Sequence, residues 1–176
     1  MDNPNKTNKH VEPEASSTKL MVRMFEIAKK AHSGQRYGDK GDYFDFHIIG
    51  VVEKLNTLPE FQSATSQEQY DMILMAIGHD LIEDTDVTEQ YLLDEGFSVD
   101  VAHGITLLSR DKETPKDVYI NRILENFKAT TVKKADTEFN YEQSIADGNE
   151  RLIDKYTKQR QDLKRNDEIH KRRHEK

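Results

Sequence analysis

The sequence contains no cysteine. Disulfide bonds, thiolate zinc sites and cysteine nucleophiles are therefore excluded. The first residues lack the apolar core of a signal peptide, and no run approaches the roughly 18 apolar residues that a membrane-spanning helix needs. We expect a soluble, cytoplasmic protein without a membrane partner.

Positive charge is absent from a long central segment. No lysine or arginine occurs between Lys54 and Arg110, although the chain has 26 such residues in total. The net charge of −7 argues against general nucleic-acid binding over the whole surface. Acidic side chains within this segment have no cationic neighbour in the sequence, and a divalent metal ion would supply the missing charge.

One folded unit is expected between two polar ends. The chain has 176 residues, of which 35% are hydrophobic and 34% are charged, and this length suits a single domain. Residues 1–17 have almost no large apolar side chain and are predicted to be a disordered N-terminal tail. Residues 164–176 are predicted to be a charged, mobile C-terminal tail, which leaves residues 18–163 as the domain.

Apolar residues recur at helical spacing through this domain, and no segment shows sustained strand alternation, so the predicted fold class is all-α. Ser66 and Gln69 form a capping-box pattern before a helix that is expected to continue through residue 83. Thr88 and Ser98 are the expected caps of the next two helices. The other helices are expected at residues 18–31, 47–57, 115–127, 131–140 and 152–163.

The most informative stretch is Gly78-His79-Asp80-Leu81-Ile82-Glu83-Asp84-Thr85. On a continuous helix, His79 and Glu83 share a face, as do Asp80 and Asp84. The polar face then carries an imidazole and three carboxylates, a donor set that suits Zn, Mn, Fe or Ni. A solvated acidic helix end is the alternative interpretation, although uncompensated acids four residues apart and late in a helix reduce its stability.

A metal site needs ligands from other segments, because two adjacent side chains cannot surround an ion. His47 follows a glycine-rich loop, and Asp136 shares a helix face with Asn140. In chain order these candidates spell His, then His-Asp, then Asp. This is the ligand order of the HD phosphohydrolases.

The flanking residues narrow this resemblance. The motifs that carry it are Ala31-His32-Ser33-Gly34-Gln35, the loop through Tyr37-Gly38-Asp39-Lys40 to His47, His79-Asp80-Leu81-Ile82-Glu83-Asp84-Thr85, Gly104-Ile105-Thr106, and Val132-Lys133-Lys134-Ala135-Asp136 through Asn140. Together they resemble the hydrolase domain of the SpoT/RelA-type family, especially its stand-alone small alarmone hydrolases. The resemblance spans about residues 20–160.

The resemblance implies an HD-domain helical bundle around a single metal site. The ion would be Mn²⁺, with another divalent metal as the alternative, and its implied ligands are His47, His79, Asp80 and Asp136. Glu83 and Asp84 would position and activate the attacking water. The implied reaction removes the 3′-pyrophosphate of guanosine tetraphosphate or pentaphosphate (ppGpp or a related alarmone) and leaves GDP or GTP.

Such a nucleotide substrate is strongly anionic, so cations must come from outside the acidic segment. The candidate phosphate contacts are Arg36 and Lys40 in the loop before His47, and Arg122 and Lys133 farther along the chain. Asn140 matches a family residue that contacts the nucleotide. These positions are therefore the expected substrate-binding residues.

Two other functions fit the same motifs. One is an HD phosphatase for another nucleotide, such as NADPH or a nucleoside monophosphate. The other is a non-catalytic HD protein that binds a nucleotide or a partner, for example by neutralising a toxin. The chain has Ile48 where many relatives have proline and Thr137 where they have arginine. Because these positions flank the expected nucleotide contacts, the substrate stays open, and the sequence does not indicate an oligomeric state.

Overall fold

The computed structural model describes residues 13–174, and the side chains of residues 17–164. The described chain is all-α and has no β-strand, which confirms the predicted fold class. Its helices are α1 (Pro13–Ala31), the π-helix η1 (Phe44–Ile48), α2 (Ile49–Asn56), α3 (Pro59–Gln62), α4 (Ser66–Gly78), α5 (Leu81–Asp84), α6 (Glu89–Asp94), α7 (Val99–Leu108), α8 (Lys116–Leu124), α9 (Phe127–Ala146) and α10 (Glu150–His174).

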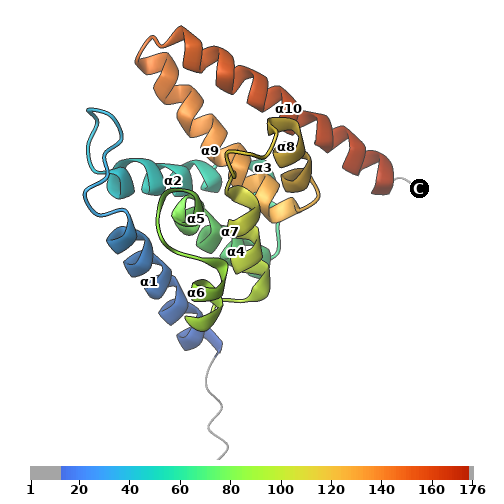
Figure 1. Cartoon of the computed structure of the whole chain (residues 1–176). Coiled ribbons are helices and arrows are strands. Elements are labelled where there is room, and N and C mark those ends of the chain that lie inside the picture. Colours follow the sequence, from blue (N-terminus) through green and yellow to red (C-terminus); the bar gives the residue numbers. More distant parts are fainter. Residues whose placement is uncertain (1–12, 175–176) are drawn as a thin grey trace, which may run out of the picture.

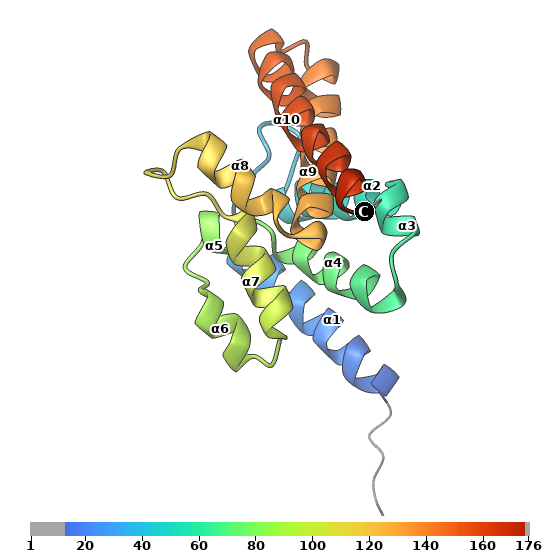
Figure 2. The ribbon, with the colours of Figure 1, turned by 90° about the vertical axis from the view of Figure 1, so that its right-hand side faces the viewer.

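The helices form two groups that meet at α9. The two long helices α9 and α10 run side by side as a hairpin at one end of the molecule, and α2 packs against α9 (Figures 1 and 2). The other end contains α1 and α6, and α4 and α7 lie between this end and α9, which both of them contact. Within the part of the chain that the structure describes, no helix is long and apolar enough to cross a membrane.

Helix α4 lies at the centre of the core. Its residues from Met72 to Gly78 are buried apart from the half-buried Ile73, so it is covered on nearly all sides. The close approach of α4 to α7 requires a glycine at position 78, because a Cβ on Gly78 would lie 2.7 Å from Cδ1 of Ile105 on α7. The end of α4, and the residue that follows it, are therefore fixed by packing.

The predicted helix caps are confirmed at two helices, and other helices begin at a different residue from the predicted one. The side chains of Thr88 and Ser98 accept hydrogen bonds at the starts of α6 and α7, as predicted. The cap of helix α4 is Thr65, one residue before the predicted cap Ser66, because Thr65 and Glu68 form the capping box. Asn126 caps α9, so this helix begins before the predicted residue 131.

The predicted unbroken helix through residue 83 is wrong. Helix α4 ends at Gly78, His79 and Asp80 form a turn, and the short helix α5 follows. The ring of His79 bonds to the carbonyl oxygen of Ala76, which an unbroken helix would offer to the amide of Asp80. The turn thus directs the side chains of His79 and Asp80 into one site, and the regular helix is interrupted there.

The predicted domain boundaries differ from the ends of the helices. Helix α1 begins at Pro13, inside the segment predicted as an N-terminal tail, and residues 1–12 of that prediction lie outside the described residues. At the other end Leu163 is buried and Lys164 is exposed, but α10 continues to His174. The segment predicted as a C-terminal tail is therefore helical as far as His174, and residues 175–176 lie outside the described part.

Candidate metal centre

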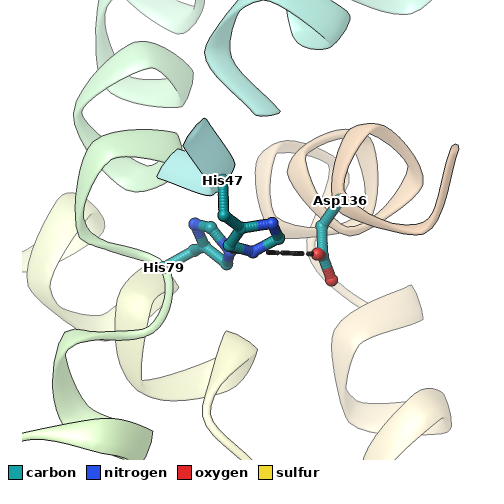
Figure 3. Close-up of side chains that lie close together, drawn as sticks. All are labelled: His47, His79 and Asp136. Carbon is teal, nitrogen blue, oxygen red and sulfur yellow. Dashed lines mark hydrogen bonds and ion pairs between the residues drawn. The ribbon is translucent and has the colours of Figure 1, made fainter. Parts of the chain in front are cut away.

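Three buried side chains from different parts of the chain converge on one point (Figure 3). His47 comes from η1, His79 follows α4, and Asp136 comes from the middle of α9. Each is at most 6% exposed. Their ligand atoms lie within 4.8 Å of one another, so this group could hold a metal ion. The sequence prediction that these three residues meet is therefore correct.

Asp80 joins the group through one carboxylate oxygen. Its Oδ2 lies 2.9 Å from Nε2 of His79 and 3.3 Å from Nε2 of His47. The hydroxyl of Tyr43 donates a hydrogen bond to the same Oδ2 at 2.6 Å. Tyr43 was not among the predicted site residues, because nothing in the local sequence indicates what its hydroxyl contacts.

The spacing of the donor atoms fits a divalent ion. Ligand atoms about 2.1 Å from a metal are separated by roughly 3.0 Å at right angles and roughly 3.4 Å in a tetrahedron. The Nε2 atoms of His47 and His79 are 3.2 Å apart, and they lie 3.6 and 3.9 Å from Oδ1 of Asp136. Two imidazoles with two carboxylates suit Zn, Mn, Fe or Ni better than Mg or Ca.

Electrostatics in the metal-free site show an excess of negative potential. Burial acts to lower the pKa of His79, but Asp80 and Asp136 outweigh it and raise that pKa to about 9. Burial acts to raise the pKa of Asp80, yet His79 and His47 hold it well below its usual range. The carboxylates therefore stay ionised and attract a cation, which is a proton when no metal competes for the site.

Neighbouring groups orient the candidate ligands. The bond of 2.8 Å from Nδ1 of His79 to the carbonyl oxygen of Ala76 places the ring proton on Nδ1 and leaves the lone pair of Nε2 facing the site. His47 lies on a π-helix, a feature that is frequent at functional sites. Its ring stacks on Tyr37, with centroids 5.2 Å apart, and its buried Nδ1 has no hydrogen-bond partner among the described residues.

Two residues that were predicted to contact the substrate, Lys133 and Asn140, form hydrogen bonds to Asp136. The ammonium group of Lys133 lies 2.8 Å from Oδ2 of Asp136. The amide group of Asn140 donates to Oδ1 of Asp136, and its own oxygen accepts a bond of 2.8 Å from the hydroxyl of Tyr37. In this arrangement both residues orient a candidate metal ligand, and their contact with a substrate stays a prediction.

The predicted catalytic acids lie on α5, directly after the His79-Asp80 turn. Oε2 of Glu83 accepts a hydrogen bond of 2.8 Å from the backbone amide of Arg110. Desolvation raises the pKa of Glu83 against the effect of this bond, and desolvation together with Asp80 raises the pKa of Asp84. Both side chains remain exposed, so they are open to a substrate and hold protons more readily than ordinary carboxylates do.

The other predicted cations have partners elsewhere. Lys40 forms an ion pair with Asp147 at the end of α9. Arg122 donates to Oγ1 of Thr114 at 3.1 Å and lines a cavity of about 440 Å³, and none of the residues lining that cavity is a candidate metal ligand. Arg36 is exposed, and its backbone forms an isolated bridge with Asp42. The structure therefore brings only Lys133, among the predicted cations, into contact with a candidate ligand.

Two lysines that the sequence analysis did not single out interact electrostatically with Lys133. Burial lowers the pKa of Lys155 on α10, and the positive charges of Lys133 and Lys116 lower it further. Burial also lowers the pKa of Lys116 on α8, and the positive charges of Arg110 and Lys133 lower it further. Mutual repulsion of this kind is relieved by an anion. The interaction of these lysines depends on how α8, α9 and α10 pack together, so no local sequence pattern indicated it.

The sequence matches no protein-family model and no curated protein in the comparisons made. The functional interpretation therefore depends on the geometry of the site and on the motif resemblance described above.

Proposed function

We propose that this protein is a metal-dependent phosphohydrolase that removes the 3′-pyrophosphate of guanosine tetraphosphate or pentaphosphate, with Mn²⁺ as its ion. The observation that carries the proposal is the convergence of buried His47, His79 and Asp136 with Asp80. The acids of α5 follow the same turn, in the order that the motif resemblance implies. A binding scaffold without chemistry would have no need of the acids beside a complete set of ligands.

The metal ligands and the acids of α5 would have different roles in hydrolysis. A divalent ion at the four ligands would lower the pKa of a water molecule and neutralise phosphate charge. Glu83 and Asp84 would accept a proton from that water, and their raised pKa values support this role because they make both carboxylates stronger proton acceptors. The water oxygen bonds to phosphorus, the bond from phosphorus to the ribose 3′ oxygen breaks, and a proton passes to that oxygen.

Phosphate charge is met by cations on the side of the site formed by α8, α9 and α10. Lys116, Lys133 and Lys155 come from these three helices; Lys133 lowers the pKa of both other lysines, and Lys116 lowers that of Lys155. The tetraphosphate carries phosphates at both ends of its ribose, so it can contact the metal and this cluster at once. Arg36, Lys40, Arg122 and Asn140 stay proposed contacts of the nucleotide.

A nucleotide panel tests the proposal. Purified protein is incubated with Mn²⁺ and with the tetraphosphate, the pentaphosphate, NADPH and nucleoside monophosphates, and the products are separated by anion exchange. Release of pyrophosphate from a 3′-diphosphate is the expected result. Release of orthophosphate from NADPH instead identifies a phosphatase for another nucleotide. Binding of nucleotide without turnover identifies a non-catalytic HD protein.

The matched control for this panel is a pair of histidine variants. His79→Ala removes a candidate ligand, whereas His103→Ala removes an exposed histidine on α7. The proposal expects loss of bound metal and of turnover in His79→Ala only. Equal activity of the two variants would refute it.

A further inference from the structure

His32 is a fully buried histidine outside the candidate metal centre. It is the first residue after α1 and is 0% exposed. Its Nε2 has no hydrogen-bond partner among the described residues. Because an unpaired buried polar atom is destabilising, an apolar side chain would serve packing better at this position. The imidazole is thus better explained by what its other nitrogen does.

The other ring nitrogen connects His32 to α5 through one intermediate residue. Nδ1 of His32 lies 2.9 Å from Oε1 of Gln35, and Nε2 of Gln35 donates to the main-chain oxygen of Asp84 at 3.1 Å. A carbonyl oxygen only accepts, so the amide nitrogen of Gln35 must face Asp84 and its oxygen must face His32. Nδ1 of His32 therefore carries a hydrogen and donates it to Gln35.

A second contact leads from the same ring to the other end of α5. The ring of His32 packs against that of Tyr43, with centroids 5.2 Å apart. The hydroxyl of Tyr43 bonds to Asp80, directly before α5. Helix α5 contains only four residues and has no side-chain cap at its start, so its own hydrogen bonds fix it weakly. External contacts at both ends have to hold it in place.

We propose that His32 is a positioning residue, which through its Nδ1 hydrogen bond to Gln35 fixes Asp84 beside the candidate metal centre. The effect of His32 on turnover rests on the proposed function, whereas its effect on the order of α5 does not.

Two substitutions separate the hydrogen bond from packing. His32→Asn retains a donor at the position of Nδ1, although it leaves more space in the core. His32→Gln fills the space better but places its amide at the position of Nε2, so the bond to Gln35 is lost. Gln35→Leu breaks the same link from the other side.

Turnover gives the first measurement, at saturating Mn²⁺ and with metal content determined for each variant. We expect His32→Asn to stay within about threefold of the parent, and His32→Gln and Gln35→Leu to lose about tenfold in kcat with KM little changed. The double variant His32→Gln/Gln35→Leu should lose no more than either single variant, because both break one link. If the Asn variant lost as much as the Gln variant, packing would explain the histidine and the proposal would be wrong.

Amide hydrogen exchange of residues 81–87 gives a second measurement that needs no substrate. Exchange should be faster in His32→Gln and Gln35→Leu than in the parent, and close to the parent in His32→Asn. This result would uphold the positioning role even if the parent hydrolysed none of the nucleotides, which would refute the proposed function alone. Unchanged exchange in all three variants would overturn the positioning role.

Discussion

Lys133 and Asp136 form an ion pair in which Nζ lies 2.8 Å from Oδ2, while Oδ1 of the same carboxylate faces His47 and His79. The lysine thus contacts the carboxylate oxygen that does not face the two histidines. Burial acts to lower the pKa of Lys133, but Asp136 and the hydroxyl group of Tyr119 hold it well above its usual range. Lys133 remains charged and neutralises part of the acidic cluster.

Lys133→Met should therefore destabilise the metal-free protein by roughly 3 kcal/mol, because the carboxylate of Asp136 loses its partner. Metal should then stabilise the variant more than it stabilises the parent, since the ion supplies the missing charge. Thermal unfolding with and without Mn²⁺ measures both effects. Lys30→Met, at an exposed position on α1, is the control. An equal metal-induced rise in Tm for Lys133→Met and the parent would contradict this account.

Metal binding should release a proton. With no metal present, His79 has a pKa of about 9, above the usual value of 6.5, so this group is protonated at neutral pH. Affinity for Mn²⁺ should rise by about tenfold per pH unit from about pH 7 and level off near pH 9. Calorimetric titrations in buffers of different ionisation enthalpy would count the protons released, and an affinity independent of pH in this window would count against His79 as a ligand.

The same pKa fixes the sign of the pH dependence of stability in the metal-free protein. Because the pKa of His79 is raised on folding, the stability it contributes is complete below about pH 6.5 and is lost as the pH rises toward 9. The midpoint of chemical denaturation should fall across this window. Saturation with metal should remove this trend, since the imidazole is then neutral, with a proton on Nδ1 only.

Gly78→Ala should disturb both packing and the metal centre. A Cβ would lie 2.7 Å from Cδ1 of Ile105 and 3.2 Å from Sδ of Met24, and the next residue is His79. Overpacking of this kind costs about 1–3 kcal/mol, and a shift of the end of α4 should also weaken metal binding. Gly104→Ala is the control for overpacking alone, because its Cβ would lie 2.3 Å from Cε of Met75 but its neighbours in the chain are not candidate ligands. Loss of metal affinity in the control but not in Gly78→Ala would contradict the argument.

The sequence allowed the helical class and several helix starts to be predicted, because these depend on local patterns. Thr88 and Ser98 accept bonds from amides three residues farther along, as their positions indicated. The break after Gly78 could not be predicted in this way. It depends on the close contact of α4 with α7 and on the bond from His79 back to Ala76.

The part of the candidate site that could be predicted from the sequence is the part in which the residue types themselves indicate a chemistry. His47, His79 and Asp136 were selected because imidazoles and carboxylates in that order indicate metal binding, and the structure brings them together. The hydrogen bond from Tyr43 to Asp80 and the electrostatic effect of Lys133 on Lys155 could not be predicted, because tyrosine and lysine occur in many settings. Their roles follow only from the packing of elements distant in sequence.

Glu83 provides the most direct test of chemistry at this site. Its Oε2 accepts the amide hydrogen of Arg110, so the carboxylate is held in place while it stays exposed. Glu83→Gln keeps the shape of the side chain and removes the proton acceptor. If Glu83 accepts a proton from the attacking water, kcat should fall by roughly a hundredfold or more, with metal content and Tm close to those of the parent.

Glu53→Gln, at an exposed position on α2, is the matched control and should leave kcat unchanged. The comparison is made at saturating Mn²⁺, so that a change in metal affinity does not enter kcat. A fall in kcat that disappeared at higher Mn²⁺ would mean that Glu83 supports metal binding. Near-parental turnover in Glu83→Gln would assign proton transfer to Asp84, whose pKa is raised by burial and by Asp80 in the same way.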